Sequence, residues 1–397
     1  MAALNSRRGW AKRQREPGVW ELRVYAGVDP HTGKKRWISR TFRGGTREAS
    51  KALAALATEI DGGDHRHDAR TVNELFDAWL VHLEARGRAP ATLHGYRNKI
   101  DKHLRPGLGR RAVSKVTARD LDEIYTSMAK GGLTRSVPGV HRVVHAAFRQ
   151  AKRWRWINSN PADDATPTTV PDPVPWAPPD ATLAALLDEA WAIDPELALY
   201  LSLTAHLGTR RSEGLALRWP DVHREAGEII VDRALYQLPG MSRPAEKDTK
   251  THASGPIPAA DTLFELLEAH HDWQRSVAAQ ADVILAADGF VFADLVSDIT
   301  GRCPWRPDRA TEAMDRLRKR PAVKDQPGAA RITVKSLRHY AATVTTSKVG
   351  LDVAKRRLRH RHITTTMRYT AAVESRDKAA AKALAPCSQA AVAEGIP

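Results

Sequence analysis

The N-terminal part of the chain alternates hydrophobic and polar positions with a period of two. The alternation covers residues 20–26 and again 35–42, which is typical of β-strands, and a turn signal lies between them at residues 29–33. Thr46 can cap a following helix. The apolar stripe of that helix consists of Ala49, Leu53, Leu56 and Ile60. The segment therefore predicts a small sheet covered by one helix.

A polar, glycine-rich stretch at residues 61–69 predicts a linker, and the hydrophobic period changes after it. Between residues 70 and 164 apolar positions recur every three or four residues and predict four helices. The fourth, from about residue 138 to 154, has a polar face rich in arginine and lysine. Two linker histidines lack a third ligand, so no metal site is predicted.

Six prolines between residues 165 and 179 rule out a helix and mark a domain boundary. The pattern beyond is mixed: it predicts helices at 180–191 and 196–217, a strand pair within 228–258, and a short buried strand at 289–292. The remainder is mainly helical. Three domains are thus predicted, spanning residues 1–64, 70–164 and 175–397, the last with a C-terminal tail.

Positive charge is concentrated in the first two predicted domains. The chain has 397 residues and a formal net charge of +16. Residues 1–66 hold 14 Lys and Arg against 7 Asp and Glu, and residues 70–164 hold 18 against 9. This excess favours a nucleic acid over a membrane surface as the partner. Because the two cysteines form no disulfide framework, a reducing cytoplasm is expected.

Basic side chains on the predicted strands and helices are candidates for contacts with the DNA backbone. The alternative is an ordinary solvated surface, which fits many of them individually. Their concentration in two consecutive segments favours DNA. The candidates are Arg23, Lys35, Arg36, Arg40, Arg97, Arg142, Arg149, Lys152 and Arg153.

Two clusters in the last domain combine cations with apolar positions. Lys335, Arg338 and His339 stand at helical spacing on one face. Arg210 lies in an apolar stretch, so it needs an anionic partner, either Glu213 three residues on or a phosphate. Taken alone, a solvated helix face explains the first cluster and a structural ion pair the second.

A tyrosine and two further groups complete a set suited to phosphoryl transfer. Tyr369 follows His360 by nine residues, and Lys250 lies at or near a predicted strand. A phenol is a poor nucleophile at neutral pH, but nearby cations favour the phenolate. Two arginines can grip phosphate oxygens and stabilise a pentacoordinate transition state, and a lysine or histidine can protonate the leaving oxygen.

In their order these residues resemble the tyrosine recombinase family, also called phage integrases. Residues 208–213 resemble its first arginine box, Lys250 its hairpin lysine, residues 335–339 its second box and 358–360 its third, followed by Tyr369. Five motifs in order within about 160 residues are a specific joint signal. Three departures occur, since the family usually has histidine, glycine and a large apolar residue where this chain has Lys335, Arg359 and Gly214.

The resemblance implies a multidomain, mainly α fold with α+β parts. The N-terminal arm-binding domain would be a three-stranded sheet plus a helix, followed by a helical, SAM-like core-binding domain and a mixed α/β catalytic domain. It also implies a homotetramer on double-stranded DNA with core and arm sites. An accessory DNA-bending or directionality factor is left open. The expected location is the nucleoid in the cytoplasm of a bacterial host.

The implied activity is site-specific recombination by a phage or mobile-element integrase, without metal or cofactor. Tyr369 would form a 3′-phosphotyrosine, Lys250 would act as general acid, and His339 is a candidate base by resemblance. The transition state would be stabilised by Arg210, Arg338, His360 and Lys335. Two alternatives stay open: relaxation of DNA like a type IB topoisomerase, and a decayed recombinase acting as a repressor or architectural protein.

Overall fold

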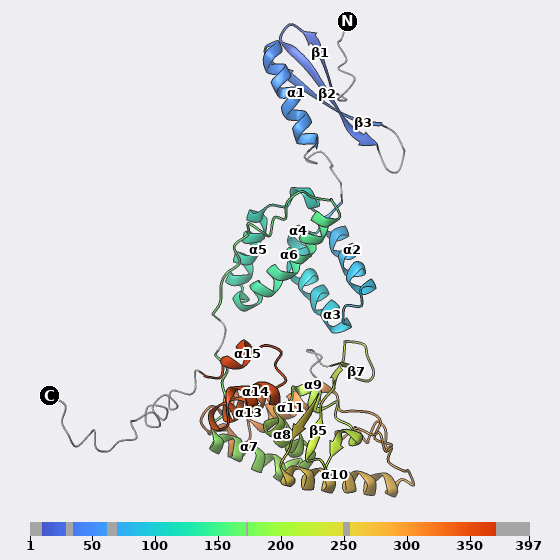
Figure 1. The fold of residues 1–397 in the computed structure, drawn as a ribbon, viewed down its shortest axis with the longest axis vertical. Coiled ribbons are helices and arrows are strands. Elements are labelled where there is room, and N and C mark those ends of the chain that lie inside the picture. Colours follow the sequence, from blue (N-terminus) through green and yellow to red (C-terminus); the bar gives the residue numbers. More distant parts are fainter. Residues whose placement is uncertain (1–9, 29–34, 62–69, 172–173, 249–254, 371–397) are drawn as a thin grey trace, which may run out of the picture. The chain divides into compact units, whose positions relative to one another are not determined.

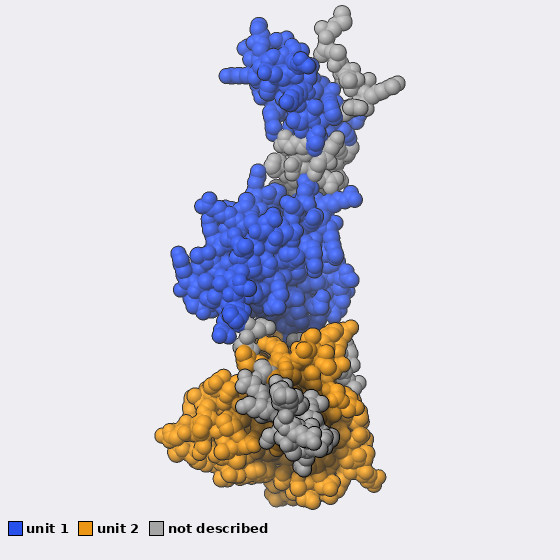
Figure 2. All heavy atoms as spheres, turned by 60° about the vertical axis from the view of Figure 1, so that its left-hand side comes forward, with its two compact units in different colours: residues 1–171 blue, residues 172–397 orange. Residues whose placement is uncertain are grey.

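The computed structural model divides the chain into two compact units, residues 1–171 and 172–397 (Figures 1 and 2). The division falls inside the proline-rich stretch. The predicted turn at 29–33, residues 62–69 of the predicted linker, Lys250 and the predicted C-terminal tail beyond residue 370 lie outside the described residues. The described residues are 10–28, 35–61, 70–171, 174–248 and 255–370.

Three antiparallel strands in the order β1-β2-β3 and one helix form the N-terminal part (Figure 1). Trp20, Leu22 and Val24 are buried in one cluster with helix residues, so the two-residue period separates a buried face from an exposed one. The first strand gave no alternation, because its last five residues, Lys12 to Glu16, are all polar. The elements are β1 (Trp10–Glu16), β2 (Val19–Val28), β3 (Lys35–Arg43) and α1 (Thr46–Asp61).

The four helices predicted next along the chain are α2, α3, α5 and α6, and they share one core that includes Phe76, Tyr125 and Phe148. Thr71 and Thr117 begin α2 and α5 with capping boxes, which satisfy backbone N–H groups in the first turns. The helices are α2 (Val72–Ala85), α3 (Pro90–Lys99), α4 (Arg105–Leu108), α5 (Ala118–Lys130) and α6 (Val137–Arg153), with a π-helical turn at Ile100–Leu104.

The second unit is a helical domain with two small antiparallel sheets, in the order β4-β5-β8 and β6-β7. One large core connects the helices and the three-stranded sheet. The strands are β4 (Val222–His223), β5 (Glu228–Ile230), β6 (Arg233–Tyr236), β7 (Ala245–Asp248) and β8 (Pro256–Pro258). The helices are α7 (Asp180–Ile193), α8 (Pro195–Leu207), α9 (Arg211–Gly214), α10 (Asp261–Gln280), α11 (Pro307–Leu317), α12 (Pro321–Lys324), α13 (Val334–Lys348), α14 (Leu351–Arg357) and α15 (Ile363–Met367).

The strand predictions in this unit need correction. Instead of one strand pair within residues 228–258, β5 pairs with β8 and β6 pairs with β7. No strand forms at residues 289–292, where Phe290 makes only an isolated bridge to Arg218. The run is apolar because it is buried, and burial alone does not distinguish a strand from an irregular segment.

The single helix predicted over residues 196–217 is also wrong, because the chain breaks after α8. Gly208 has φ +66°, in the left-handed region that favours glycine. A Cβ at this position would lie 2.8 Å from Leu358 Cδ2. The break lets residues 209 and 210 leave the helix and lets the segment after α14 approach the end of α8.

We expect Gly208→Ala to lower the free energy of unfolding of the second unit by about 2–4 kcal/mol, from backbone strain and overpacking together. Gly227→Ala is a matched control, because Gly227 also has φ +66° but has no atom within 4 Å of the added Cβ. Gly227→Ala should lower the free energy of unfolding only by the backbone strain, about 1 kcal/mol. Equal losses in urea unfolding would contradict the close packing at Gly208.

Candidate active site

Helix α13 positions three of the predicted site residues. Thr333 caps it, and its hydroxyl accepts a hydrogen bond from the backbone N–H of Ser336. Arg338 is buried, His339 is half-buried and Lys335 is exposed. The helical spacing predicted from the sequence therefore brings all three to the wall of one cavity.

Arg338 is held by two backbone segments that are distant in the sequence. Its Nη1 donates to Gly208 O at 2.5 Å and its Nη2 donates to Leu358 O at 2.7 Å. These bonds use two of the five N–H groups of the guanidinium, so N–H groups remain for a ligand. Burial, followed by the charge of Arg210, lowers the pKa of Arg338 to about 9, and an anion would therefore stabilise its charged form.

Glu213 is the carboxylate partner of Arg210, as the sequence suggested. Its Oε2 accepts the Arg210 backbone N–H at 3.0 Å, and its Oε1 accepts from the Arg210 guanidinium. The Glu213 side chain is only 1% exposed, and Arg359 Nη2 donates to its Oε2 at 2.5 Å. Although burial opposes it, the charges of Arg359 and Arg210 keep the pKa of Glu213 below its ordinary value.

Tyr369 and His339 form a hydrogen-bonded pair. The Tyr369 hydroxyl lies 2.7 Å from His339 Nδ1, and the tyrosine is 6% exposed. Burial raises the pKa of Tyr369, while Arg338, Arg368 and Arg210 oppose this. Burial, followed by the charges of Lys335 and Arg338, lowers the pKa of His339 to about 4. At neutral pH the phenol is therefore protonated and the imidazole is free to accept its proton.

His360 lies beside the same tyrosine. The two rings are stacked, with centroids 6.5 Å apart, and His360 Nδ1 lies 2.9 Å from the Thr366 hydroxyl. Burial, followed by the charge of Arg338, lowers the pKa of His360 to about 4. If the Thr366 hydroxyl donates to Nδ1, the neutral ring carries its proton on Nε2 and can donate it to a ligand.

The two histidines should make stability fall in acid. Their pKa values are lowered to about 4 in the folded chain, so between pH 6.5 and 4 the unfolded chain binds more protons. We expect the Tm to fall as the pH decreases through this window, and to fall less in the variant His339→Gln/His360→Gln. The control is His223→Gln at an exposed position. An unchanged pH dependence in the double variant would contradict this assignment.

The cavity that collects these residues has a volume of about 1120 Å³. It brings together six of the seven predicted site residues, Arg210, Lys335, Arg338, His339, His360 and Tyr369, while Lys250 is not described. Four further cations that were not predicted as site residues line it, and only Arg211 of these lies inside a motif. They are Arg211, Lys247, Arg331 and Arg368. Glu213 is the one acidic residue among the described lining residues, so the cavity is suited to a polyanion.

The order of the motifs did not assign these four cations to the site, because their places at the cavity depend on how the second unit folds. Arg211 directly follows Arg210 but pairs with Asp308 of α11 at 3.3 Å. Arg331 stacks on Trp176, 4.6 Å from the ring centroid. Lys247 comes from β7 and Arg368 precedes the tyrosine. Only the fold brings these residues to one wall, although the basic residue next to Tyr369 is visible in the sequence.

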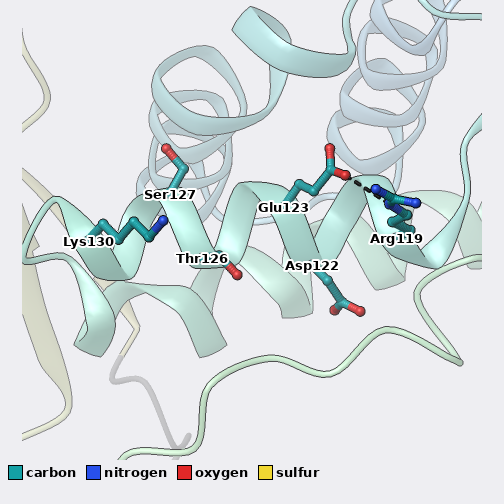
Figure 3. A pocket seen from close by; sticks show the side chains of 6 residues that line it. All are labelled: Arg119, Asp122, Glu123, Thr126, Ser127 and Lys130. Carbon is teal, nitrogen blue, oxygen red and sulfur yellow. Dashed lines mark hydrogen bonds and ion pairs between the residues drawn. The ribbon is translucent and has the colours of Figure 1, made fainter.

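A different hollow lies on α5 in the first unit, with a volume of about 570 Å³ (Figure 3). Arg119 and Glu123 are paired there at 3.0 Å, and Asp122 accepts the Thr166 backbone N–H at 2.7 Å. Its lining contains none of the predicted site residues. Within the described ranges, no three His, Cys, Asp or Glu side chains gather as a metal site, and no helix has the length and apolarity to cross a membrane.

Most of the candidate DNA-contacting residues are exposed where their side chains are described. Arg23 of β2 packs over Trp37, with its guanidinium 5.1 Å from the ring centroid. Arg97 of α3 lies 3.5 Å from Glu84. Arg36 lies in β3, and its side chain is outside the described atoms. The remaining exposed candidates are Lys35 and Arg40 on β3, and Arg142, Arg149, Lys152 and Arg153 on the polar face of α6.

The phage integrase family domain matches residues 181–376, which contain the whole cavity apart from residues 174–176. Through this domain the chain belongs to the phage integrase family. The match confirms the family that the five motifs indicated. The observed helices and small sheets also confirm the predicted multidomain, mainly α fold with α+β parts.

Known integrases resemble much of the chain. An integrase of Saccharopolyspora erythraea is 26% identical over 256 residues, covering 61% of this chain and 56% of that integrase. An integrase of Streptomyces ambofaciens is 26% identical over 363 residues, covering 88% and 87%. A lambda integrase tetramer bound to a Holliday junction matches with a TM-score of 0.57 at 19% identity, covering 89% of this chain and 96% of that one. At this identity the structural match supports the fold.

Proposed function

We propose that this chain is a site-specific DNA recombinase, an integrase of a phage or mobile element, which cuts and rejoins duplex DNA through Tyr369. The observation that carries the proposal is the 2.7 Å contact between the Tyr369 hydroxyl and His339 Nδ1 inside a cavity lined by cations. A nucleophile, a proton acceptor and phosphate-binding groups are thus within reach of one phosphorus atom.

In the first step the Tyr369 oxygen attacks phosphorus as its proton passes to His339. A P–O bond to tyrosine forms, and the P–O5′ bond breaks, giving a 3′-phosphotyrosine and a 5′-hydroxyl. Because burial raises the pKa of Tyr369, proton loss and attack are expected to occur together. The leaving oxygen takes a proton from Lys250 in this proposal, as the family resemblance implies.

Arg210 and Arg338 would grip the non-bridging phosphate oxygens, and His360 would donate from Nε2. Arg338 is fixed by its two carbonyl partners, so it needs little reorganisation when negative charge develops. Lys335 lies on the exposed side of the cavity and would assist electrostatically. Rejoining reverses the step when a 5′-hydroxyl attacks the phosphotyrosine.

The proposed partners are duplex DNA with core and arm sites and three further copies of the chain, acting in the bacterial nucleoid. The lambda match on a Holliday junction supports the tetramer. The three domain limits at 1–64, 70–164 and 175–397 belong to the same proposal, with the first two domains binding DNA. A DNA-bending or directionality factor is a further proposed partner.

The proposal is tested with a nicked suicide substrate, which traps the enzyme on DNA because the cleaved end diffuses away. Covalent attachment at the element's own attachment site is the expected result. Relaxation of any supercoiled plasmid without a specific site would favour the topoisomerase alternative. Binding without any covalent product would favour the non-enzymatic alternative.

For the polar face of α6, we expect Arg149→Ala to weaken binding evenly across DNA sequences and to reduce the slope of log K against log salt by about 1, because one phosphate contact is lost. The control is Arg119→Ala on α5, whose side chain is paired with Glu123. A salt slope equal to that of the wild type would remove Arg149 from the proposed DNA-binding surface.

A further inference from the structure

Arg359 stands where the resembling family usually has glycine, and the backbone shows why glycine is usual. It follows the C-cap of α14 with φ +52°, in the left-handed region. Its N–H donates to Arg356 O at 2.9 Å, and the His360 N–H donates to Lys355 O at 3.1 Å. This is the Schellman arrangement, in which glycine avoids the strain that any other residue bears.

The buried side chain of Arg359 also destabilises the fold. It is 5% exposed, and its Nη2 reaches Glu213 Oε2 at 2.5 Å. Its Nε and Nη1 have no hydrogen-bond partner among the described residues. Buried donors without partners destabilise a fold. A strained backbone and an incompletely satisfied buried cation at one position indicate a functional reason for the residue.

The position of Glu213 supplies that reason. Its carboxylate faces three guanidiniums: it accepts from Arg210 and Arg359, and Arg338 Nη1 lies 3.9 Å from its Oε2. At that distance Arg338 makes no hydrogen bond to Glu213 and donates instead to the Gly208 and Leu358 carbonyls. Without Arg359, Oε2 would keep only the Arg210 backbone N–H as a hydrogen-bond donor, and Arg338, at 3.9 Å, could move toward it.

We propose that Arg359 is a positioning residue that occupies Glu213 and thereby keeps Arg338 in place for the scissile phosphate. This inference rests on the proposed recombinase function and gives a role to the residue at which the third motif departs from the family pattern. The three guanidiniums and one carboxylate also leave the cluster with two net positive charges. A phosphodiester attacked by a phenolate carries two negative charges, so the cluster matches the transition state.

The experiment compares three variants in single-turnover cleavage of a suicide substrate, with DNA affinity and Tm measured in parallel. Arg359→Lys and Arg359→Met both keep a long side chain on the left-handed backbone, but only lysine keeps the charge. Arg359→Gly removes the backbone strain together with the charge. If Arg359 had only a structural role, its variants would lose stability and activity together.

We expect Arg359→Met and Arg359→Gly to cleave about tenfold or more slowly than the wild type, with DNA affinity unchanged, as is typical when a supporting partner of a site residue is lost. Arg359→Lys should retain most of the cleavage rate, and the Tm of Arg359→Gly should equal or exceed that of Arg359→Met. Cleavage by Arg359→Met at the wild-type rate, or cleavage by Arg359→Lys as slow as by Arg359→Met, would overturn the inference.

The same assay separates this inference from the function on which it rests. If the wild type forms no covalent product while it binds the DNA, the proposed function fails. If the wild type forms the product and Arg359→Met does so equally fast, only the role of Arg359 fails.

Discussion

Tyr369→Phe is expected to bind DNA like the wild type and to form no covalent product. The substitution removes one oxygen, the proposed nucleophile, and no neighbouring group replaces it. We expect the single-turnover cleavage rate to fall by at least about 10⁴-fold, the scale seen when a nucleophile is deleted. A suicide substrate that is labelled on the strand segment ending at the scissile 3′-phosphate reports the product directly on a denaturing gel.

The phenylalanine ring should keep the packing of the tyrosine, which forms a buried cluster with Ala342 and Leu358. Tyr340→Phe is the control, because Tyr340 comes from the same region of α13 but does not line the cavity. It should cleave at the wild-type rate. Cleavage by Tyr369→Phe with an unchanged adduct would show that another side chain attacks the phosphate.

Arg338→Lys is expected to have the next largest effect, on both rate and stability. Lysine keeps a charge but cannot reach the Gly208 and Leu358 carbonyls and a phosphate at once. We expect cleavage to fall by about 10²–10³-fold, as for loss of a preorganised donor. Each buried carbonyl left without a partner should lower the free energy of unfolding by about 1–3 kcal/mol.

Arg356→Lys is the control for this substitution, since the Arg356 side chain is 77% exposed on α14 and pairs only loosely with Asp352 at 3.7 Å. It should change neither the cleavage rate nor urea unfolding. If Arg338→Lys cleaves as fast as the control, the Arg338 guanidinium takes no part in the reaction, and its hydrogen bonds to the Gly208 and Leu358 carbonyls are only structural.

The sequence predicted two groupings of the candidate site because their members lie in local patterns. Lys335, Arg338 and His339 share a helix face at fixed spacing, and Glu213 lies three residues after Arg210, so both groupings follow from the geometry of a single turn. The four-helix part was predictable for the same reason, because capping residues and apolar stripes coincide there.

Other features depend on chain segments that only the fold brings together. The close packing at the break after α8 joins Gly208 to Leu358, which is 150 positions away. The contact between His339 and Tyr369 and the pairing of Arg359 with Glu213 likewise join distant segments. The hydrophobic pattern did not show the first strand, because its polar residues carry no alternation, although the family resemblance implied a three-stranded sheet. The apolar run at 289–292 was buried without being a strand.

The most direct test of the account is to digest the covalent product and identify by mass spectrometry the peptide that carries the DNA. We predict that the peptide containing Tyr369 carries a nucleotide that is attached through its 3′-phosphate. No other residue should carry an alkali-stable phosphate linkage to the DNA. Attachment of the nucleotide to any other side chain, or through its 5′-phosphate, would contradict the central claim.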